Sequence, residues 1–314
     1  MSSTEPERVR RDLDHLPAVQ QGELERVVAI LMRDFEAAIS GATQPWKRNG
    51  KVLKVILFGS YARDDWVDEP ENGYQSDFDL LVIVNHADLT DVADYWYIAE
   101  DRIQRDQTIG RQVNIIVHSL DEVNNALRRG EYFWTDIARD GIALYELPQH
   151  SLATPAALTP VDAYAMSREY FDSWFPETGR RLEAFQFEFE KASVDIGWAK
   201  GAAFALHQSA ERLFGCYLLT RSLYFPRSHN IKFLRSLAED KEPRLVVAWP
   251  RATKQDRRRF ELLKRAYVEA RYSPNYTIEM ADLEALAVAV RALRAIVETV
   301  CLERLEVLKA EAGI

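Results

Sequence analysis

Short apolar runs rich in β-branched residues constrain the fold of the first half of this chain more than any other feature. Three runs have the length and composition of β-strands, at residues 52–58 (VLKVILF), 78–84 (FDLLVIV) and 113–118 (VNIIVH). The middle run is apolar almost throughout, which is typical of a strand buried on both faces. The sequence therefore predicts a sheet in this half of the chain.

Helical patterns alternate with these strands. Residues 87–104 lie between the second and third runs, residues 120–130 follow the third, and both segments carry a helical pattern. Two further helices are expected before the first strand, within residues 5–41. Strands that alternate with helices in this way predict an α/β or α+β domain.

The sequence changes character near residue 150. Residues 147–162 contain three prolines and few charges, which is typical of a linker. Helical periodicity follows in three segments, at residues 162–222, 228–239 and 253–310. We therefore expect two domains, residues 1–150 and residues 151–314, the second of them an all-α bundle.

Composition narrows the possible partners. A formal net charge of −9 disfavours broad, sequence-independent binding to nucleic acid, which needs a basic surface. Cys216 and Cys301 lie among apolar residues, so buried reduced thiols are expected. No apolar run is long enough to span a bilayer, and the N-terminal residues form no apolar signal core. A cytoplasmic location and no membrane partner are the corresponding expectations.

A Gly-Ser turn follows the first predicted strand. The strand ends at Phe58, and Gly59 and Ser60 open a short helix that carries Tyr61 and Arg63. Glycine lets the backbone turn sharply and approach a ligand closely, and the first amides of a helix are donors that suit phosphate. Arg63 is placed to meet a phosphate or a nearby carboxylate. A plain helix start is the alternative reading of the same residues.

Two acidic residues open the second predicted strand. Residues two apart on a strand share a face, so Asp77 and Asp79 are expected to project together while Phe78 faces the other way. Two adjacent carboxylates repel each other unless a cation neutralises them, and Mg²⁺ takes one or two carboxylates together with phosphate oxygens. The alternative is a solvated turn with both acids exposed.

The combined motif resembles the nucleotidyltransferases of the DNA polymerase β superfamily, whose signature is a Gly-Ser turn, a nearby Arg and an Asp-x-Asp on the next strand. The matching residues here are Gly59, Ser60, Arg63, Asp77 and Asp79. The resemblance covers about residues 50–146. It implies an α+β fold with a mixed sheet and flanking helices, an NTP, expected to be ATP, on the Gly-Ser turn, and Mg²⁺ at the acid pair. The connection at residues 64–76 is longer than in the smallest members and is expected to shape the acceptor pocket.

The resemblance also implies a third carboxylate on a later strand, and this chain departs from that pattern. The corresponding position holds Asn114, with Ile116 and His118 on the same face of the strand. An amide coordinates a metal weakly and cannot act as a base. Three alternatives follow: a base elsewhere, with His118 or Glu122 as candidates; an acceptor that ionises without a base; or lost activity.

The second half resembles a HEPN domain over about residues 160–310, on the segments AAFALHQSAERL and PRSHNIKFL. His207 and Glu211 stand one helical turn apart there, as either a catalytic or a structural pair. Ribonuclease members of that family carry an Arg followed, four to six residues later, by a His. No His follows Arg271 in this way, and the Arg111–His118 pair lies in the first half. Ribonuclease activity is therefore not expected; the bundle would instead wall the nucleotide site or bind the acceptor, with Arg271 and Tyr272 as candidate contacts.

The resemblance implies transfer of NMP, expected to be AMP from ATP, to a hydroxyl acceptor with release of pyrophosphate. The acceptor could be a protein hydroxyl, a small molecule such as an aminoglycoside, or an RNA end, and the acidic charge balance makes RNA the least favoured of the three. An alternative is a nucleotide-binding, toxin–antitoxin-like regulatory module whose chemistry has decayed. Asn114 and the missing histidine after Arg271 favour this alternative. A homodimer through the helical domain is a further expectation.

Overall fold

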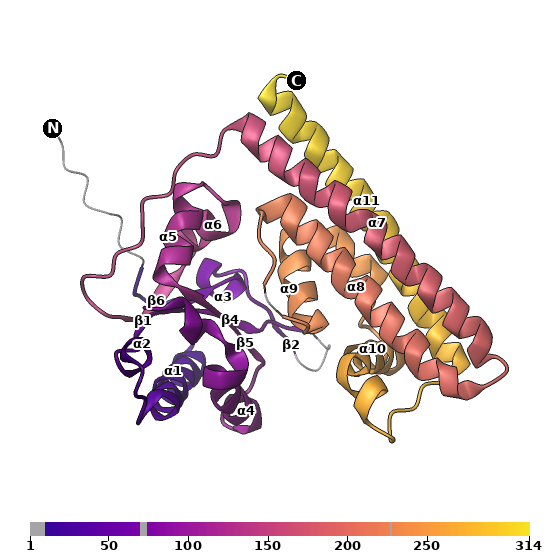
Figure 1. The fold of residues 1–314 in the computed structure, drawn as a ribbon, viewed down its shortest axis with the longest axis horizontal. Helices are drawn as coiled ribbons and strands as arrows, with labels where there is room; N and C mark the ends of the chain where they lie inside the picture. Colours follow the sequence, from indigo (N-terminus) through magenta and orange to yellow (C-terminus); the bar gives the residue numbers. More distant parts are fainter. Residues whose placement is uncertain (1–9, 70–73, 227) are drawn as a thin grey trace. The chain divides into compact units, whose positions relative to one another are not determined.

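The computed structural model describes residues 10–69, 74–226 and 228–314 (Figure 1). The chain divides into two compact units, and the boundary between them falls between Leu158 and Thr159.

The N-terminal unit combines helices with a four-stranded sheet. Its helices are α1 (Ala18–Ile39), α2 (Pro45–Arg48), α3 (Ser60–Arg63), η2 (Ala87–Thr90), η3 (Val92–Trp96), α4 (Tyr97–Arg105), α5 (Leu120–Arg128) and α6 (Tyr132–Asp140). Its sheet contains β1 (Val52–Phe58), β4 (Phe78–Val84), β5 (Val113–Ser119) and β6 (Ile142–Glu146), and a separate two-stranded sheet pairs β2 (Asp68–Glu69) with β3 (Tyr74–Gln75). The three predicted strands are confirmed, and β6 is an addition to them.

The order of the strands in the main sheet is β5-β4-β1-β6. Strand β1 is antiparallel to both β4 and β6, whereas β4 and β5 run parallel, so the sheet is mixed as predicted. Alternate residues of β4, beginning with Phe78, enter a core that also holds apolar residues of α1 and α4. On the other face, Phe58 and His118 contact aromatic residues of α6. Figure 1 shows α1 and α4 on one side of this sheet and α5 and α6 on the other.

Two helix predictions in this unit need correction. Among the described residues of 5–41 there is one helix, α1, rather than two, because apolar residues at helical spacing continue from Leu24 to Phe35 without a break. Residues 5–9 lie outside the described residues. The helix expected at 87–104 is divided into η2, η3 and α4. The side chain of His86 accepts from the amide of Asp88 and starts η2, and the side chain of Asp91 accepts from the amide of Asp94 and starts η3.

The C-terminal unit is all-helical, as predicted. It contains α7 (Pro160–Ala192), η4 (Ile196–Trp198), α8 (Ala199–Ser222), α9 (Ile231–Lys241), η5 (Pro243–Ala248), α10 (Lys254–Tyr272) and α11 (Met280–Ala312). Helix α8 is buried along most of its length and packs against α7, α9, α10 and α11. Cys216 and Cys301 are free thiols buried in this unit, which confirms the prediction.

The longest helices do not have the character of membrane spans. Across the described parts of the chain, no helix is both long enough and apolar enough to cross a bilayer.

Candidate functional site at the end of the central strands

The Gly59 turn lies directly against one of the two predicted acids. Gly59 has a φ of 75°, in the region that favours glycine, and follows β1 without a gap. A Cβ atom placed on Gly59 would lie 2.6 Å from Oδ2 of Asp79. The following helix, α3, is a single turn that ends at Asp64 in a left-handed conformation. Glycine is therefore needed here both for the turn and for the approach of the carboxylate.

Strand register places the acid pair at the start of β4, between β1 and β5. Asp79 is the register partner of Phe58 on β1 and of Asn114 on β5. Asp77, two residues earlier, is 6% exposed and Asp79 is 5% exposed, so the reading of two solvated acids at a polar turn is wrong. Buried carboxylates need hydrogen-bond donors or a cation as partners.

Asn114 supplies hydrogen bonds to both acids. Its Nδ2 donates to Oδ1 of Asp79 at 2.9 Å and to Oδ2 of Asp77 at 3.4 Å. Its Oδ1 accepts a hydrogen bond of 2.7 Å from Nε2 of Gln112. The sequence predicted the position of Asn114, but not that its amide would join the two acids, and Gln112 was not predicted at all.

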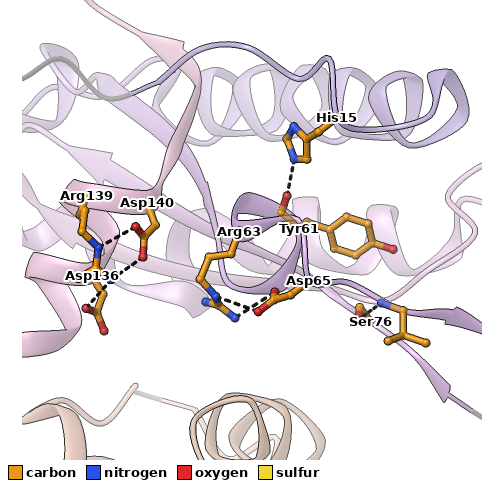
Figure 2. A network of polar contacts seen from close by, with 9 residues as sticks. His15, Tyr61, Arg63, Asp65, Ser76, Asp136, Arg139 and Asp140 are labelled. Atoms are coloured by element: carbon orange, nitrogen blue, oxygen red, sulfur yellow. Dashed lines mark hydrogen bonds and ion pairs between the residues drawn. The ribbon is translucent and has the colours of Figure 1, made fainter.

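Arg63 lies one turn beyond Ser60 and forms an ion pair with Asp65, with Nε and Oδ2 separated by 3.2 Å (Figure 2). Asp65 is thus a carboxylate partner of the kind expected for Arg63, and contact of Arg63 with a phosphate stays a prediction. His15 supports the same turn by donating from Nε2 to the carbonyl of Tyr61, at 2.7 Å.

Arg111 is a buried residue that supports the site, and the sequence did not predict this role. Its side chain is 4% exposed, and its Nε lies 2.6 Å from Oε2 of Glu23 on α1. The guanidinium also bonds to the hydroxyl of Tyr61 on α3 and lies 5.1 Å from the ring centre of Phe78 on β4. Burial raises the pKa of the Tyr61 phenol. Arg111 thus ties the glycine turn and the start of β4 to α1.

The two candidate bases do not join the acid pair. His118 is the register partner of Ile83 on β4, whereas Asn114 is the partner of Asp79. The four-residue separation along β5 corresponds to about 13 Å. Nδ1 of His118 lies 3.0 Å from Oε2 of Glu122, and its ring packs edge-on against Trp134. The structure therefore gives this pair a local partnership away from Asp79.

The connection at residues 64–76 is tied at its base. The backbone amide of Ser76 donates to the carbonyl of Val67 at 2.8 Å, and the amide of Val67 donates to the Ser76 hydroxyl at 3.0 Å. Residues 70–73 lie outside the described residues, so the expected role of this connection in shaping an acceptor pocket stays a prediction.

A second polar cluster lies within the helical unit. Nδ1 of His229 is 3.2 Å from Glu211, and Nδ1 of the buried His207 is 3.8 Å from the same carboxylate. Burial, with a smaller effect from His229, lowers the pKa of His207 to about 3. Arg271 donates from Nε to the carbonyl of Tyr267 at 2.6 Å. The cluster therefore contains one buried, neutral histidine, His207, and one more exposed histidine, His229.

The carboxylate oxygens of the acid pair are suitable ligands for a hard divalent cation that is also bound by phosphate. Mg²⁺ prefers oxygen ligands and is commonly bound by one or two carboxylates plus substrate phosphates. Within the described ranges, His, Cys, Asp and Glu side chains form no cluster of three or more that could hold a metal by themselves. Asp77 and Asp79 are thus suited to share a cation with a bound triphosphate.

Comparison with known proteins agrees with both units. Residues 41–122 match the family described as a nucleotidyltransferase domain, and residues 173–305 match the HEPN domain. The chain is also 29% identical over 99 residues to “Putative protein adenylyltransferase” of Methanocaldococcus jannaschii, an alignment that covers 32% of this chain and 84% of the relative. The chain thus carries a nucleotidyltransferase domain followed by a HEPN domain. These findings support nucleotidyl transfer in general.

Proposed function

We propose that this protein transfers a nucleoside monophosphate, AMP in preference to others, from an Mg²⁺-bound triphosphate to a hydroxyl acceptor. The observation that carries the proposal is the contact between the Gly59 turn and Asp79, beside a second buried acid, Asp77. Phosphoryl chemistry needs a backbone that can approach phosphates closely and carboxylates that can hold a cation among them. Both requirements meet at this end of the sheet.

In the proposed reaction, Asp77 and Asp79 hold the cation, and the turn at Gly59 and Ser60 receives the triphosphate. The bound cation neutralises charge on the triphosphate and on the departing pyrophosphate. The acceptor oxygen forms a bond to the α-phosphorus, the bond from that phosphorus to the bridging oxygen breaks, and pyrophosphate leaves with the electron pair. The proton of the acceptor passes to solvent or to a group on the acceptor, since the position facing Asp79 on β5 holds the amide of Asn114. Catalysis then depends mainly on positioning and charge neutralisation.

A protein hydroxyl is the preferred acceptor in this proposal. The archaeal relative is named for adenylyl transfer to protein, and its alignment covers 84% of its own length. The acidic net charge of −9 disfavours RNA as the acceptor. A cationic small molecule remains the second acceptor to test.

The test is turnover with α-labelled ATP and Mg²⁺, measured as pyrophosphate release and as label carried by protein, aminoglycoside or RNA. Asp77→Asn and Asp79→Asn should each lower the rate at least about 100-fold, because a metal-ion contribution of several kcal/mol is lost. Asp88→Asn removes the same charge from a side chain that is 63% exposed in the same unit, and should leave the rate unchanged.

Absence of pyrophosphate release with every NTP and every acceptor class would contradict the proposal. If ATP still bound with Mg²⁺ in that case, the result would favour the alternative of a regulatory nucleotide-binding module, for which Asn114 in place of a third carboxylate is the supporting observation.

A further inference from the structure

The side-chain amides of Gln112 and Asn114 form a chain of hydrogen bonds that ends at the acid pair. Gln112 and Asn114 are two residues apart on or next to β5, and their side chains are joined by a hydrogen bond of 2.7 Å. Nδ2 of Asn114 then reaches one oxygen of each acid, at 2.9 Å for Asp79 and 3.4 Å for Asp77. We call these two side chains the amide relay.

The direction of the amide relay follows from what each group can donate. An ionised carboxylate only accepts hydrogen bonds, so Asn114 must present its NH₂ group to the acids. Its carbonyl oxygen then faces Gln112, which donates from Nε2. Gln112 therefore determines which end of the Asn114 amide points at the acid pair.

The amide relay also bears on the charge of the pair. Two buried carboxylates so close in sequence repel each other, and a shared donor lowers the cost of keeping both ionised. Asn114 is itself 5% exposed, so its hydrogen bonds are protected from water. A carboxylate at the same position would instead add a third negative charge and a third possible metal ligand.

We propose that Asn114, oriented by Gln112, is a positioning residue that holds Asp77 and Asp79 ready for a metal. This inference rests on the proposed function, since it concerns the metal ligands of the same site. Two carboxylates and an amide donor bind a bare cation weakly, and the triphosphate completes its coordination.

The first experiment measures Mn²⁺ binding by electron paramagnetic resonance on the full chain, with and without a non-hydrolysable ATP analogue. Mn²⁺ alone should bind weakly, and the analogue should tighten its binding at least about tenfold, as expected when phosphate oxygens complete the ligand set. These two affinities are the reference values for the variants. Because this measurement needs no turnover, it separates failure of the inference from failure of the proposed reaction.

The second experiment removes the donor that orients Asn114. In Gln112→Leu no side chain at position 112 donates to Oδ1 of Asn114, so the amide is no longer held with its NH₂ group toward the acids. Mn²⁺ binding in the presence of the analogue should weaken about 10- to 100-fold, as is typical when a group that orients metal ligands is lost. The matched control is Gln107→Leu, which makes the same uncharged change at an exposed position of the same unit. Unchanged or tighter binding in Gln112→Leu alone would overturn the positioning role.

The third experiment is Asn114→Asp, which places a carboxylate opposite Asp79. Mn²⁺ alone should then bind at least about tenfold more tightly, because a third hard ligand is present before the nucleotide arrives. Thermal melting with saturating Mn²⁺ checks that the variant is folded. Unaltered Mn²⁺ binding by the folded variant would show that position 114 does not face the metal, and would overturn the inference.

Discussion

Two buried sites, one in each unit, treat ionisable groups in opposite ways. At the end of the sheet, Asp77 and Asp79 are buried, and the amide of Asn114 donates to both. In the helical unit, His207 is fully buried, and its nearest carboxylate, on Glu211, is 3.8 Å away. Burial with donors keeps a charge available for a ligand, whereas burial without close partners removes the charge.

The N-terminal unit contains an internal reference for this comparison. Glu100 on α4 is a carboxyl group whose pKa burial alone raises to about 7. Asp79 differs from it in having Asn114 as a donor and the Gly59 turn in contact. The difference teaches that the surroundings of an acid, rather than burial itself, distinguish a candidate metal ligand from a group that prefers to be neutral.

The largest expected effect comes from closing the space beside Asp79. In Gly59→Ala the new Cβ would lie 2.6 Å from Oδ2 of Asp79, at a residue whose φ is positive. We expect nucleotidyl transfer to fall about 100-fold, as is typical when a catalytic group is misplaced by about 1 Å. Gly41→Ala is the matched control, because Gly41 has a φ of 74° with nothing within 4 Å of the added atom. Equal losses in the two variants would show that backbone strain, not contact with Asp79, is the cause.

Removing the carboxyl group of Glu100 should raise the free energy of unfolding at pH 8. The pKa of Glu100 is raised from 4.5 to about 7 in the folded protein, so its stabilising contribution is complete below pH 4.5 and is lost as the pH rises through 7. Glu100→Gln should therefore be more stable than the wild type at pH 8, by on the order of 2–3 kcal/mol. Urea unfolding at pH 4.5 and pH 8 measures this, with Glu25→Gln, at an exposed position of α1, as the control for loss of one charge. A difference that does not vary with pH would contradict the assignment.

His207 in the helical unit should have the opposite pH dependence: it should lower the stability of the folded protein at acidic pH. The pKa of His207 is lowered from 6.5 to about 3. The unfolded chain binds a proton below pH 6.5 that the folded unit does not, so stability is retained above pH 6.5 and lost as the pH falls toward 3. At pH 5 the loss is about 2 kcal/mol. His207→Leu should flatten the fall in stability between pH 7 and pH 5, measured by urea unfolding at each pH. A variant that follows the wild-type pH dependence would contradict a neutral His207.

The smallest expected effect concerns the other histidine–glutamate pair. Because His118 is the register partner of Ile83 and not of Asp79, His118→Gln should change the transfer rate less than about threefold, whereas loss of a general base costs about 100-fold or more. The rate per folded molecule, with the folded fraction taken from circular dichroism, is the measurement. A 100-fold loss would contradict the placement of His118 away from the reacting groups.

The sequence by itself determined three strands, the helical character of the second unit, and the turn and acids of the candidate site. Runs of β-branched residues identified β1, β4 and β5 because alternating, buried strands need that composition. The helical spacing of apolar residues identified the second unit as all-α, and this prediction needed no tertiary contact. The Gly59 turn and the acid pair were singled out because a glycine after a strand and two carboxylates spaced two apart on the next strand are readable in the sequence.

Only the tertiary structure decided how those residues meet. The order β5-β4-β1-β6 places Asp79 between Phe58 and Asn114, and no local pattern specifies which strands become neighbours. The same register pairs His118 with Ile83 and so separates it from the acids. Arg111 and Gln112 had no local signal, because their partners on α1, on α3 and across the sheet are distant in sequence or depend on side-chain orientation. Strand pairing is a long-range property of the chain, and at this site it decides which acids receive donors.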